Sequence, residues 1–318
     1  MTRRSISLLR SVTWLSAAES RQYLFYLLVA GALARAMLLF APPHSTDIYR
    51  YVWDGRVEAD GINPYRYVPA DPALAHLRDH DIYLNVNRKD YAPTIYPPAA
   101  RLVYFVATRL SETVTMMKAV MLGFEAAAVW ALSRLLAARG LPMVLASLYF
   151  LHPLAIWEVS GSGHADIIAV AFTLLSLLAA EKGNRIVCGV LLATATLTKY
   201  FPLCLAPAIY RRWDWRMPAA FAVSVVAFYL PYMSAGSKVL GFLGGYAGEE
   251  FGGGEGIFLA VLLKHIGLGA AALPLFLALA AHSRLPPPSR SLSPLTIAGT
   301  FFGLFPFFAF SRGPQCFG

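Results

Sequence analysis

The sequence has few charged residues and few cysteines. Charged side chains make up 14% of its 318 residues, whereas 57% of the residues are hydrophobic. A soluble domain of this length rarely has such a composition, so a polytopic membrane protein is the leading class. The three cysteines, Cys188, Cys204 and Cys316, form no CxxC pair, and they therefore indicate neither a zinc site nor a disulfide framework.

Several common motifs are also absent from the sequence. It contains no Walker A, GxGxxG, GxSxG or HExxH pattern, so ATP-driven transport, Rossmann dinucleotide binding, serine hydrolysis and zincin chemistry have no motif support. The net charge of +9 does not indicate nucleic acid, because most of the basic excess lies in short segments between apolar runs. This is the positive-inside pattern of membrane proteins. We expect no cofactor, no bound metal and no nucleic-acid partner.

Long apolar runs predict an all-α polytopic membrane protein. The first span, Tyr23–Phe40, carries Arg35, which either snorkels to the interface or faces the bundle. Pro97 and Pro98 open a short amphipathic segment, Ala99–Leu110, that we expect along the interface. Further spans are expected near 114–137, 141–157, 165–180, 217–235, 257–281 and 292–310. The predicted domains are a cytoplasmic tail at 1–21, one transmembrane domain at 22–311 with a long first outer loop at 41–98, and a short tail at 312–318.

Residues 186–210 leave two topologies open. If they cross the membrane once, the basic segments after this run and after the next pair of spans both lie outside. If they enter, break near Thr198–Pro202 and return, both basic segments lie inside, which the positive-inside rule favours. The second topology puts the 41–95 loop, the 158–164 turn, Lys199 and the glycine-rich 236–256 loop on one outer face. That last loop is either a flexible lid or a plain linker.

The long polar loop after the first span carries the first candidate site. At helical spacing it holds acidic, basic and aromatic residues that would share one helix face: Asp47, Arg50, Tyr51, Asp54 and Glu58. Spacing alone favours an ordinary solvated face, with an i,i+4 ion pair between Arg50 and Asp54 and with Asp54 and Glu58 as i,i+4 neighbours. Asp47, however, lies within a few residues of the membrane boundary, where a lipid head group would sit. Nearby tyrosines and a tryptophan suit either an interfacial belt or stacking on sugars.

Two further polar clusters interrupt apolar runs. Glu158, His164 and Asp166 flank a Gly-Ser-Gly turn between two spans, where they are a helix-capping tip, an active-site wall or weak metal ligands. In the wall interpretation, His164 contacts a phosphate or a hydroxyl. Lys199 lies inside an apolar run, so it either snorkels from a helix end or meets an anion such as a lipid-linked phosphate.

These strings together resemble a known family. DIYRYVWDGRVEADGINPYRYVP at 47–69, VNRKD at 86–90 and TIYPP at 94–98 resemble bacterial integral-membrane glycosyltransferases of the GT-C superfamily, and within it the polyprenol-phosphate-mannose-dependent mannosyltransferases. HPLAIWEVSGSGHADI at 152–167 and TKYFPLCLAPAIYRR at 198–212 resemble later segments of that group. The resemblance spans roughly residues 23 to 260. Members usually continue through additional spans beyond the SRGPQCFG that ends this sequence, which leads us to expect a truncation or a shifted reading frame.

The resemblance implies a hexosyltransferase in a GT-C-like helix bundle of the cell membrane. A hexose, mannose in the named group, would pass from a polyprenyl-phosphate donor to a glycan or glycolipid acceptor on the outer or periplasmic face. The implied base is Asp47, with Asp54 as the runner-up. The donor phosphate would bind Lys199, Arg50 and His164, and the site wall would include Glu158, Asp166, Tyr51 and Tyr96. The competing functions are a membrane transporter or lipid flippase and an inactive truncated paralogue.

Overall fold

The computed structural model describes residues 17–245, and within that range the secondary structure is entirely helical. Three of its helical segments are long and apolar enough to cross a membrane, namely Gln22–Phe40, Val114–Ala138 and Arg216–Gly245. A bent pair of helices over 143–162 brings the number of candidate spans to four. The predicted class, an all-α polytopic membrane protein, is confirmed.

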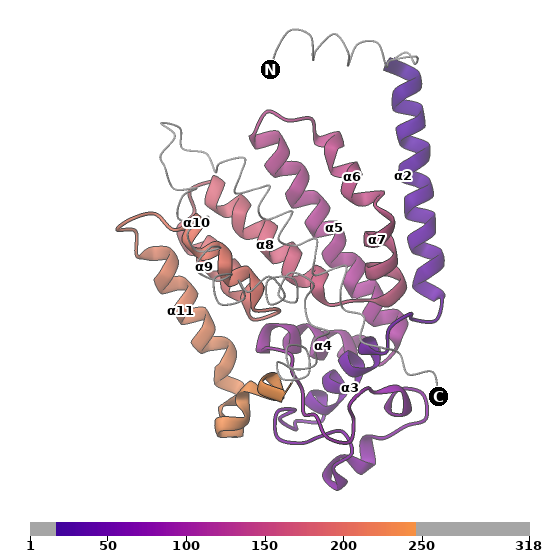
Figure 1. Ribbon diagram of the computed structural model, residues 1–318, viewed down its shortest axis with the longest axis vertical. Helices are drawn as coiled ribbons and strands as arrows, with labels where there is room; N and C mark the ends of the chain where they lie inside the picture. Colours follow the sequence, from indigo (N-terminus) through magenta and orange to yellow (C-terminus); the bar gives the residue numbers. More distant parts are fainter. Residues whose placement is uncertain (1–16, 246–318) are drawn as a thin grey trace, which may run out of the picture.

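The helices form a bundle with a polar cap at one end (Figure 1). The bundle contains α2 (Ala17–Phe40), α5 (Val114–Ala138), α8 (Asp166–Glu181), α9 (Arg185–Thr196) and α11 (Arg216–Tyr229). Helix α3 (Asp47–Ala59) of the predicted outer loop and helix α4 (Pro98–Leu110), which follows that loop, lie at the lower end in Figure 1. We call this end of the bundle the α3 end. The predicted helix at Asp47 and the predicted amphipathic segment at Ala99–Leu110 are confirmed.

Local sequence signals account for several helix ends. Thr113 accepts a hydrogen bond from the backbone N–H of Met116 and so caps the start of α5, and Asn184 caps α9 in the same way through Val187. The prolines at 97 and 98 fit the start of α4, because a first-turn N–H has no helical partner to lose. The first span begins at Ala17, six residues before the expected start, so the helix takes in the end of the predicted tail.

The expected span at 141–157 is broken rather than continuous. It consists of η3 (Met143–Leu145), α6 (Ala146–Phe150), α7 (Pro153–Ala155) and the π-helical η4 (Ile156–Ser162), with a bend of 60° between the two halves. Pro153 supplies the break, since a proline cannot donate to the preceding turn. Helical structure also extends through Ser162, so the turn expected at Ser160–Gly163 is shorter and centres on Gly163.

The break and return expected for residues 186–210 are present in the structure. After α9, the chain turns and continues through η5 (Phe201–Leu205) and α10 (Ala206–Ile209). The guanidinium of Arg185, at the start of α9, donates to the carbonyl oxygen of Ile209 at 3.3 Å and lies 3.9 Å from Asp214. Both ends of this segment therefore lie at the same end of the bundle. Its break reaches the α3 end, where Leu197 accepts hydrogen bonds from the first turn of α4.

Arg35 faces the bundle instead of snorkelling. Its guanidinium contacts both carboxylate oxygens of Glu125 on α5, at 2.8 and 2.7 Å, and also donates to the carbonyl oxygens of Gly31 and Phe150. The pair is buried, so the carboxylate compensates a cation that would be costly in an apolar environment. This contact joins α2 to α5 and to the broken segment that follows.

A second buried ionic network joins α3 to α4. Arg101 of α4 is fully buried, and its guanidinium lies 2.7 Å from Asp54 and 3.0 Å from Glu58, one turn further along α3. Arg50 approaches the same Asp54 carboxylate at 2.9 Å, and the hydroxyl of Thr94 donates to it at 2.5 Å. The i,i+4 pairing of Arg50 with Asp54 is as expected from spacing, but the solvated face is wrong because α4 covers it.

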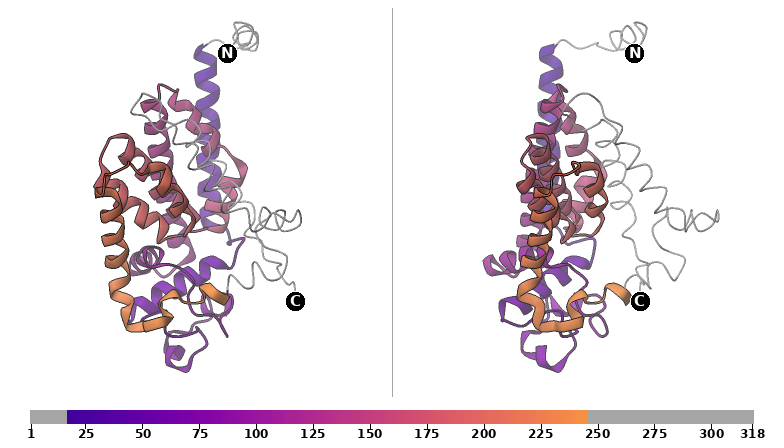
Figure 2. Two further views of the ribbon diagram at one scale, coloured as in Figure 1. Left: turned by 60° about the vertical axis from the view of Figure 1, so that its left-hand side comes forward. Right: turned by 90° about the vertical axis from the view of Figure 1, so that its left-hand side faces the viewer.

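The end of α11 closes over the same region through η6 (Leu230–Leu240), as the two side views of Figure 2 show. Tyr232 donates to Glu58, and Asn63 donates to the backbone of Tyr232 and to the side chain of Ser234. Gly241 has a φ of 57°, and a Cβ there would lie 1.8 Å from the carbonyl oxygen of Thr94. Gly241 and Phe242 of the predicted lid or linker thus pack against the first loop, where Phe242 also contacts Tyr91.

The remaining sequence-based expectations fall outside residues 17–245. These are the spans near 257–281 and 292–310, the tail at 312–318 with the ending from which a truncation was expected, and the rest of the glycine-rich loop, 246–256.

The buried network predicts a large stability difference between two Asp-to-Asn changes. Asp54→Asn removes the charge that compensates Arg50 and Arg101, and we expect it to lower the free energy of unfolding by about 3 kcal/mol. The control Asp60→Asn removes a half-exposed partner of His76 and should cost less than about 1 kcal/mol. Thermal unfolding of the two variants in one detergent measures the difference. Equal losses would contradict a structural role for Asp54.

Candidate functional site

Asp47 begins α3 and is the half-exposed carboxylate of that helix. Its side chain is 30% exposed, whereas that of Asp54, two turns later, is 3% exposed. The amide of Asn87 donates to Oδ1 of Asp47 at 2.5 Å and fixes the plane of the carboxylate. Among residues 17–245, Oδ2 accepts no hydrogen bond. One oxygen of Asp47 is therefore held, and the other accepts no hydrogen bond from the described residues.

His164 links Asp47 to Glu158. Its Nδ1 lies 2.5 Å from Oε2 of Glu158, while its Nε2 lies 3.9 Å from Oδ2 of Asp47. Burial by itself would lower the pKa of His164, but hydrogen bonding with Glu158 and the charges of Asp47 and Asp166 outweigh it and raise that pKa above the ordinary value. These carboxylates therefore stabilise the imidazolium form relative to the neutral imidazole.

Lys199 lies at the same end of the bundle, beside the start of α8. Its Nζ is 3.1 Å from Oδ1 of Asp166, the first residue of that helix, and its side chain is 31% exposed. An ammonium group that is partly open to solvent can contact an anion such as a phosphate. The predicted placement of Lys199 near the 158–164 turn agrees with the structure.

The turn between η4 and α8 sets the position of His164. Gly163 has a φ of 72°, a conformation that favours glycine, and a Cβ added there would lie 2.3 Å from Cδ1 of Ile48. On its other side, the added atom would lie 3.2 Å from the side chain of Lys118. The turn thus packs directly on the first turn of α3, which brings His164 to Asp47. A π-helical turn such as η4 is often found at functional sites.

Arg50 and Asp54 lie deeper than the other candidates. Besides its contact with Asp54, Arg50 donates to the backbone carbonyl of Ala92 at 3.0 Å, and it is almost fully buried. The carboxylate of Asp54 contacts two guanidinium groups and one hydroxyl. Both residues therefore belong to the ionic network between α3 and α4, and neither is brought to the Asp47–His164 contact.

Tyr51 and Tyr96 belong to a buried aromatic cluster beneath the site. Tyr51 stacks on Tyr104 with a centroid distance of 4.7 Å, and Tyr96 packs edge-on against both rings. Burial raises the pKa of Tyr51 well above its ordinary value, and Tyr96 and Asp47 add to the increase. Tyr51 therefore stays neutral and is part of the buried core next to α3.

Sequence reasoning missed two residues at this end of the bundle. Asn87, quoted only as part of a resemblance string, holds Asp47. Lys118, within an expected span, is fully buried and donates to the carbonyl oxygens of Leu38 and Ala41 at 2.9 Å each, which caps the end of α2. An isolated lysine in an apolar run was a usable signal, because such a cation needs a partner.

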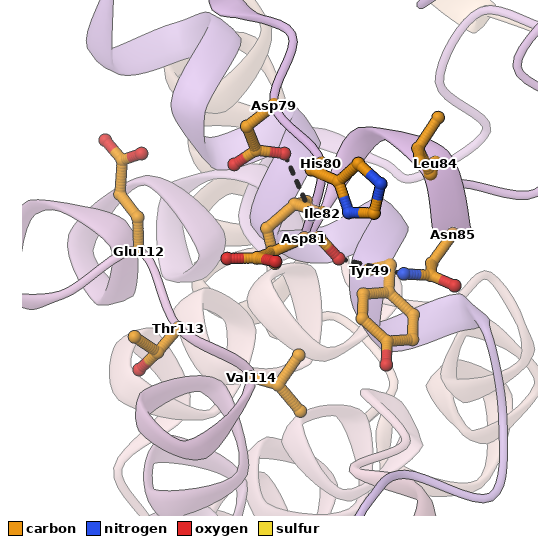
Figure 3. Close-up of a pocket in the computed structure, with 10 residues that line it drawn as sticks. All are labelled: Tyr49, Asp79, His80, Asp81, Ile82, Leu84, Asn85, Glu112, Thr113 and Val114. Atoms are coloured by element: carbon orange, nitrogen blue, oxygen red, sulfur yellow. Dashed lines mark hydrogen bonds between the residues drawn. The ribbon is translucent and has the colours of Figure 1, made fainter.

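A separate open pocket of about 570 Å³ lies on the α3–α5 side of the first loop (Figure 3). Helix α3, the first loop and the start of α5 surround it. Its lining is Tyr49, Asp79, His80, Asp81, Ile82, Leu84, Asn85, Glu112, Thr113 and Val114. None of the predicted site residues lines it. Arg56 neutralises Asp79 and Glu112 at 2.7 Å each. In residues 17–245, no group of three or more His, Cys, Asp or Glu side chains is placed to hold a metal ion.

Comparison with known proteins places this chain in a family. A family described as alpha-(1->6)-mannopyranosyltransferase, N-terminal domain, matches residues 6–214. The chain belongs to this family. The match covers α2 to α10 and contains every predicted site residue. The predicted resemblance to GT-C mannosyltransferases is confirmed at the level of the family.

One curated relative shows how much of a longer protein the match represents. Alpha-(1->6)-mannopyranosyltransferase A of Mycobacterium tuberculosis (strain ATCC 25618 / H37Rv) is 26% identical over 163 residues, which are 51% of this chain and 31% of the relative. The matched part is thus about a third of that relative's length. No solved structure matches the chain.

The packing of Gly163 gives a stability prediction with an internal control. Gly163→Ala introduces backbone strain and an overlap with Ile48, whereas Gly183→Ala, at a φ of 77° with open space around it, introduces strain alone. The strain costs about 1–2 kcal/mol at either site, and the overlap adds about 1–3 kcal/mol at Gly163. Thermal unfolding of both variants should show the larger loss for Gly163→Ala. Equal losses would mean that the turn does not pack tightly on α3.

Proposed function

We propose that this protein is a membrane mannosyltransferase that uses a polyprenyl-phosphate-linked donor. It transfers the hexose to a glycan or glycolipid acceptor, on the outer or periplasmic face of the cell membrane. Family membership supports the transferase class, and the relative's name supports mannose as the sugar. The basic residues at the end opposite α3 support this orientation under the positive-inside rule; they include Arg134, Arg139, Lys182, Arg185, Arg211, Arg212 and Arg216.

The contrast among the carboxylates of α3 carries the proposal. Asp54 and Glu58 are both neutralised by Arg101, and Glu58 also accepts from Tyr232. Asp47 keeps one oxygen available in a half-exposed position just beyond the end of α2. A general base must reach a substrate proton, and Asp47 is partly exposed to a substrate whereas Asp54 is enclosed.

The proposed reaction is a single inverting displacement. Oδ2 of Asp47 accepts the proton of the acceptor hydroxyl while the hydroxyl oxygen forms its bond to the anomeric carbon. The bond between that carbon and the phosphate oxygen breaks, and its electron pair leaves with the polyprenyl phosphate. The transition state is oxocarbenium-like, as in other glycosyl transfers.

Lys199 is the proposed partner of the leaving phosphate. It lies at the α3 end, is partly exposed, and stands next to the N-terminus of the 16-residue helix α8, whose dipole also favours an anion. Negative charge grows on the phosphate as the bond breaks, so an ammonium group there stabilises the transition state. Arg50 is no longer proposed for this role, because its guanidinium is already bound to Asp54 and to backbone carbonyls.

A transporter is a second candidate, since the structure contains two broken segments instead of the one expected from sequence. The bend within 143–162 and the return within 186–210 resemble the discontinuous helices that bind substrates in transporters. Uptake of polyprenyl-phosphate sugar into reconstituted vesicles, without formation of a new glycosidic bond, would favour transport. Bond formation in open membranes with no sealed compartment would favour transfer.

Replacement of the proposed base should abolish transfer. We expect Asp47→Asn to lower the turnover of labelled polyprenyl-phosphate mannose by about 10²- to 10⁴-fold, because Asn cannot accept the proton. Asp60→Asn, at the other end of α3, is the control and should retain turnover. Equal activity of Asp47→Asn and the wild type would eliminate Asp47 as the base.

Replacement of Lys199, the proposed phosphate partner, should mainly lower kcat/KM for the donor. Lys199→Gln removes a charge-assisted contact, so kcat/KM for the donor should fall about 10- to 100-fold. Lys182→Gln, on a lysine at the opposite end of the bundle, is the matched control and should leave kcat/KM unchanged. The proposal fails for Lys199 if its variant differs from wild type only in the KM of the acceptor.

A further inference from the structure

The contact between Asp47 and His164 leaves a gap of a particular size. Nε2 of His164 and Oδ2 of Asp47 are 3.9 Å apart, which is too far for a direct hydrogen bond. The His164 side chain is only 9% exposed, yet its Nε2 has no hydrogen-bond partner within the described part of the chain. A buried polar atom without a partner is uncommon in folded proteins and needs an explanation.

One oxygen atom of a ligand fits between these two groups. An oxygen placed about 2.8 Å from each of them completes a triangle with an angle of roughly 90° at the ligand atom. The imidazolium Nε2–H can only donate to that oxygen, and the carboxylate Oδ2 can only accept from it. The bound atom must therefore accept one hydrogen bond and donate another. A hydroxyl group meets this requirement, whereas an ionised phosphate oxygen has no proton to donate and would be repelled by Asp47.

Both walls of the gap are held by partners outside it. Asn87 fixes Oδ1 of Asp47, and Glu158 contacts Nδ1 of His164 at 2.5 Å. This is the arrangement by which a carboxylate sets the orientation and protonation of a histidine. Gly163, next to His164 in the chain, is packed against Ile48 and Lys118. The rigid turn limits the distance over which His164 can move relative to α3.

The charged groups around His164 come from four elements. Glu158 lies on η4, Asp47 on α3, and Asp166 on α8, and all three are carboxylates. Of the lysines on neighbouring segments, Lys199 pairs with Asp166, and Lys118 on α5 binds the backbone carbonyls at the end of α2. The carboxylates predominate next to the ring, so the loss of any one of them should favour the neutral imidazole.

We propose that Asp47 and His164 form a binding site for a sugar hydroxyl, with Glu158 and Asn87 as the residues that position its two walls. This inference rests on the proposed function and assigns the hydroxyl to the attacking group of the acceptor. His164 donates to one lone pair of the hydroxyl oxygen, which leaves the second lone pair directed at the anomeric carbon. The hydroxyl proton goes to Asp47, and His164 keeps its own proton throughout. His164 thus binds the acceptor, and the donor phosphate is left to Lys199.

The first test is the pH dependence of transfer by full-length protein in membranes. If the imidazolium binds the hydroxyl, kcat/KM for the acceptor falls on the alkaline side as His164 loses its proton. Glu158→Gln removes a charge that favours the imidazolium, so it should move this alkaline limb to lower pH. His164→Gln should remove the limb and lower kcat/KM about 10²-fold. His76→Gln, in a surface pair with Asp60, is the control and should match the wild type.

Three results would overturn the proposal. An acid limb that moves with Glu158→Gln would mean that neutral His164 is itself the base. Weaker binding of polyprenyl-phosphate mannose to His164→Gln in the absence of acceptor would mean that the gap holds a group of the donor. An unchanged pH profile in Glu158→Gln would show that Glu158 does not position His164.

A second measurement separates failure of this inference from failure of the proposed function. Exchange of the histidine C2 hydrogen, followed by mass spectrometry, reports the protonation midpoint of each imidazole without any turnover. The midpoint of His164 should be above 6.5 in the wild type and should fall in both Glu158→Gln and Asp47→Asn, while that of His76 in the same samples stays constant. If no lipid-linked sugar supports transfer but these shifts occur, the donor assignment fails and the coupled hydroxyl site stands. If the protonation midpoint of His164 is unchanged in both variants, the proposed hydroxyl site is wrong.

Discussion

The arrangement of the α3 end depends on one buried guanidinium. Arg101 carries a full charge with no exposed surface, and the carboxylates of Asp54 and Glu58 are what make that burial tolerable. Because both carboxylates lie on α3, the pairing fixes α4 across that helix. The first turn of α4 then donates hydrogen bonds to the carbonyl oxygen of Leu197. These bonds position the break after α9, where Lys199 lies. A single ionic contact thus relates the two regions that hold the proposed base and the proposed phosphate partner.

The same helix shows how environment gives identical side chains different chemistry. Asp47 and Asp54 are two turns apart on α3, but Asp54 is enclosed by α4 and satisfied by two arginines and a threonine. Asp47 lies past the edge of α4, where Asn87 and His164 approach it and leave one oxygen accessible. Because its hydrogen-bonding and charge partners are complete, Asp54 stabilises the fold. Asp47 has fewer partners and can bind a ligand.

Much of the fold followed from sequence, but the distances at the site did not. The length of the apolar runs predicted α2 and α5, the helical spacing of polar residues predicted α3, and two prolines predicted the start of α4. The distribution of basic residues correctly predicted that residues 186–210 break and return to the end of the bundle at which they begin. Spacing could not show that Arg101 covers the polar face of α3, because that contact joins residues distant in the chain. It also could not show that Gly163 packs on Ile48, which depends on a left-handed backbone turn.

The contact between Arg35 and Glu125 has a consequence for how the protein is made. The two residues are 90 positions apart, with the whole first polar loop between them. During synthesis from the N-terminus, α2 therefore meets the membrane with an arginine whose carboxylate has not yet been translated. The first span should be retained by the insertion machinery, or held shallow in the bilayer, until α5 arrives. Its final depth is then decided by a helix that the ribosome produces much later.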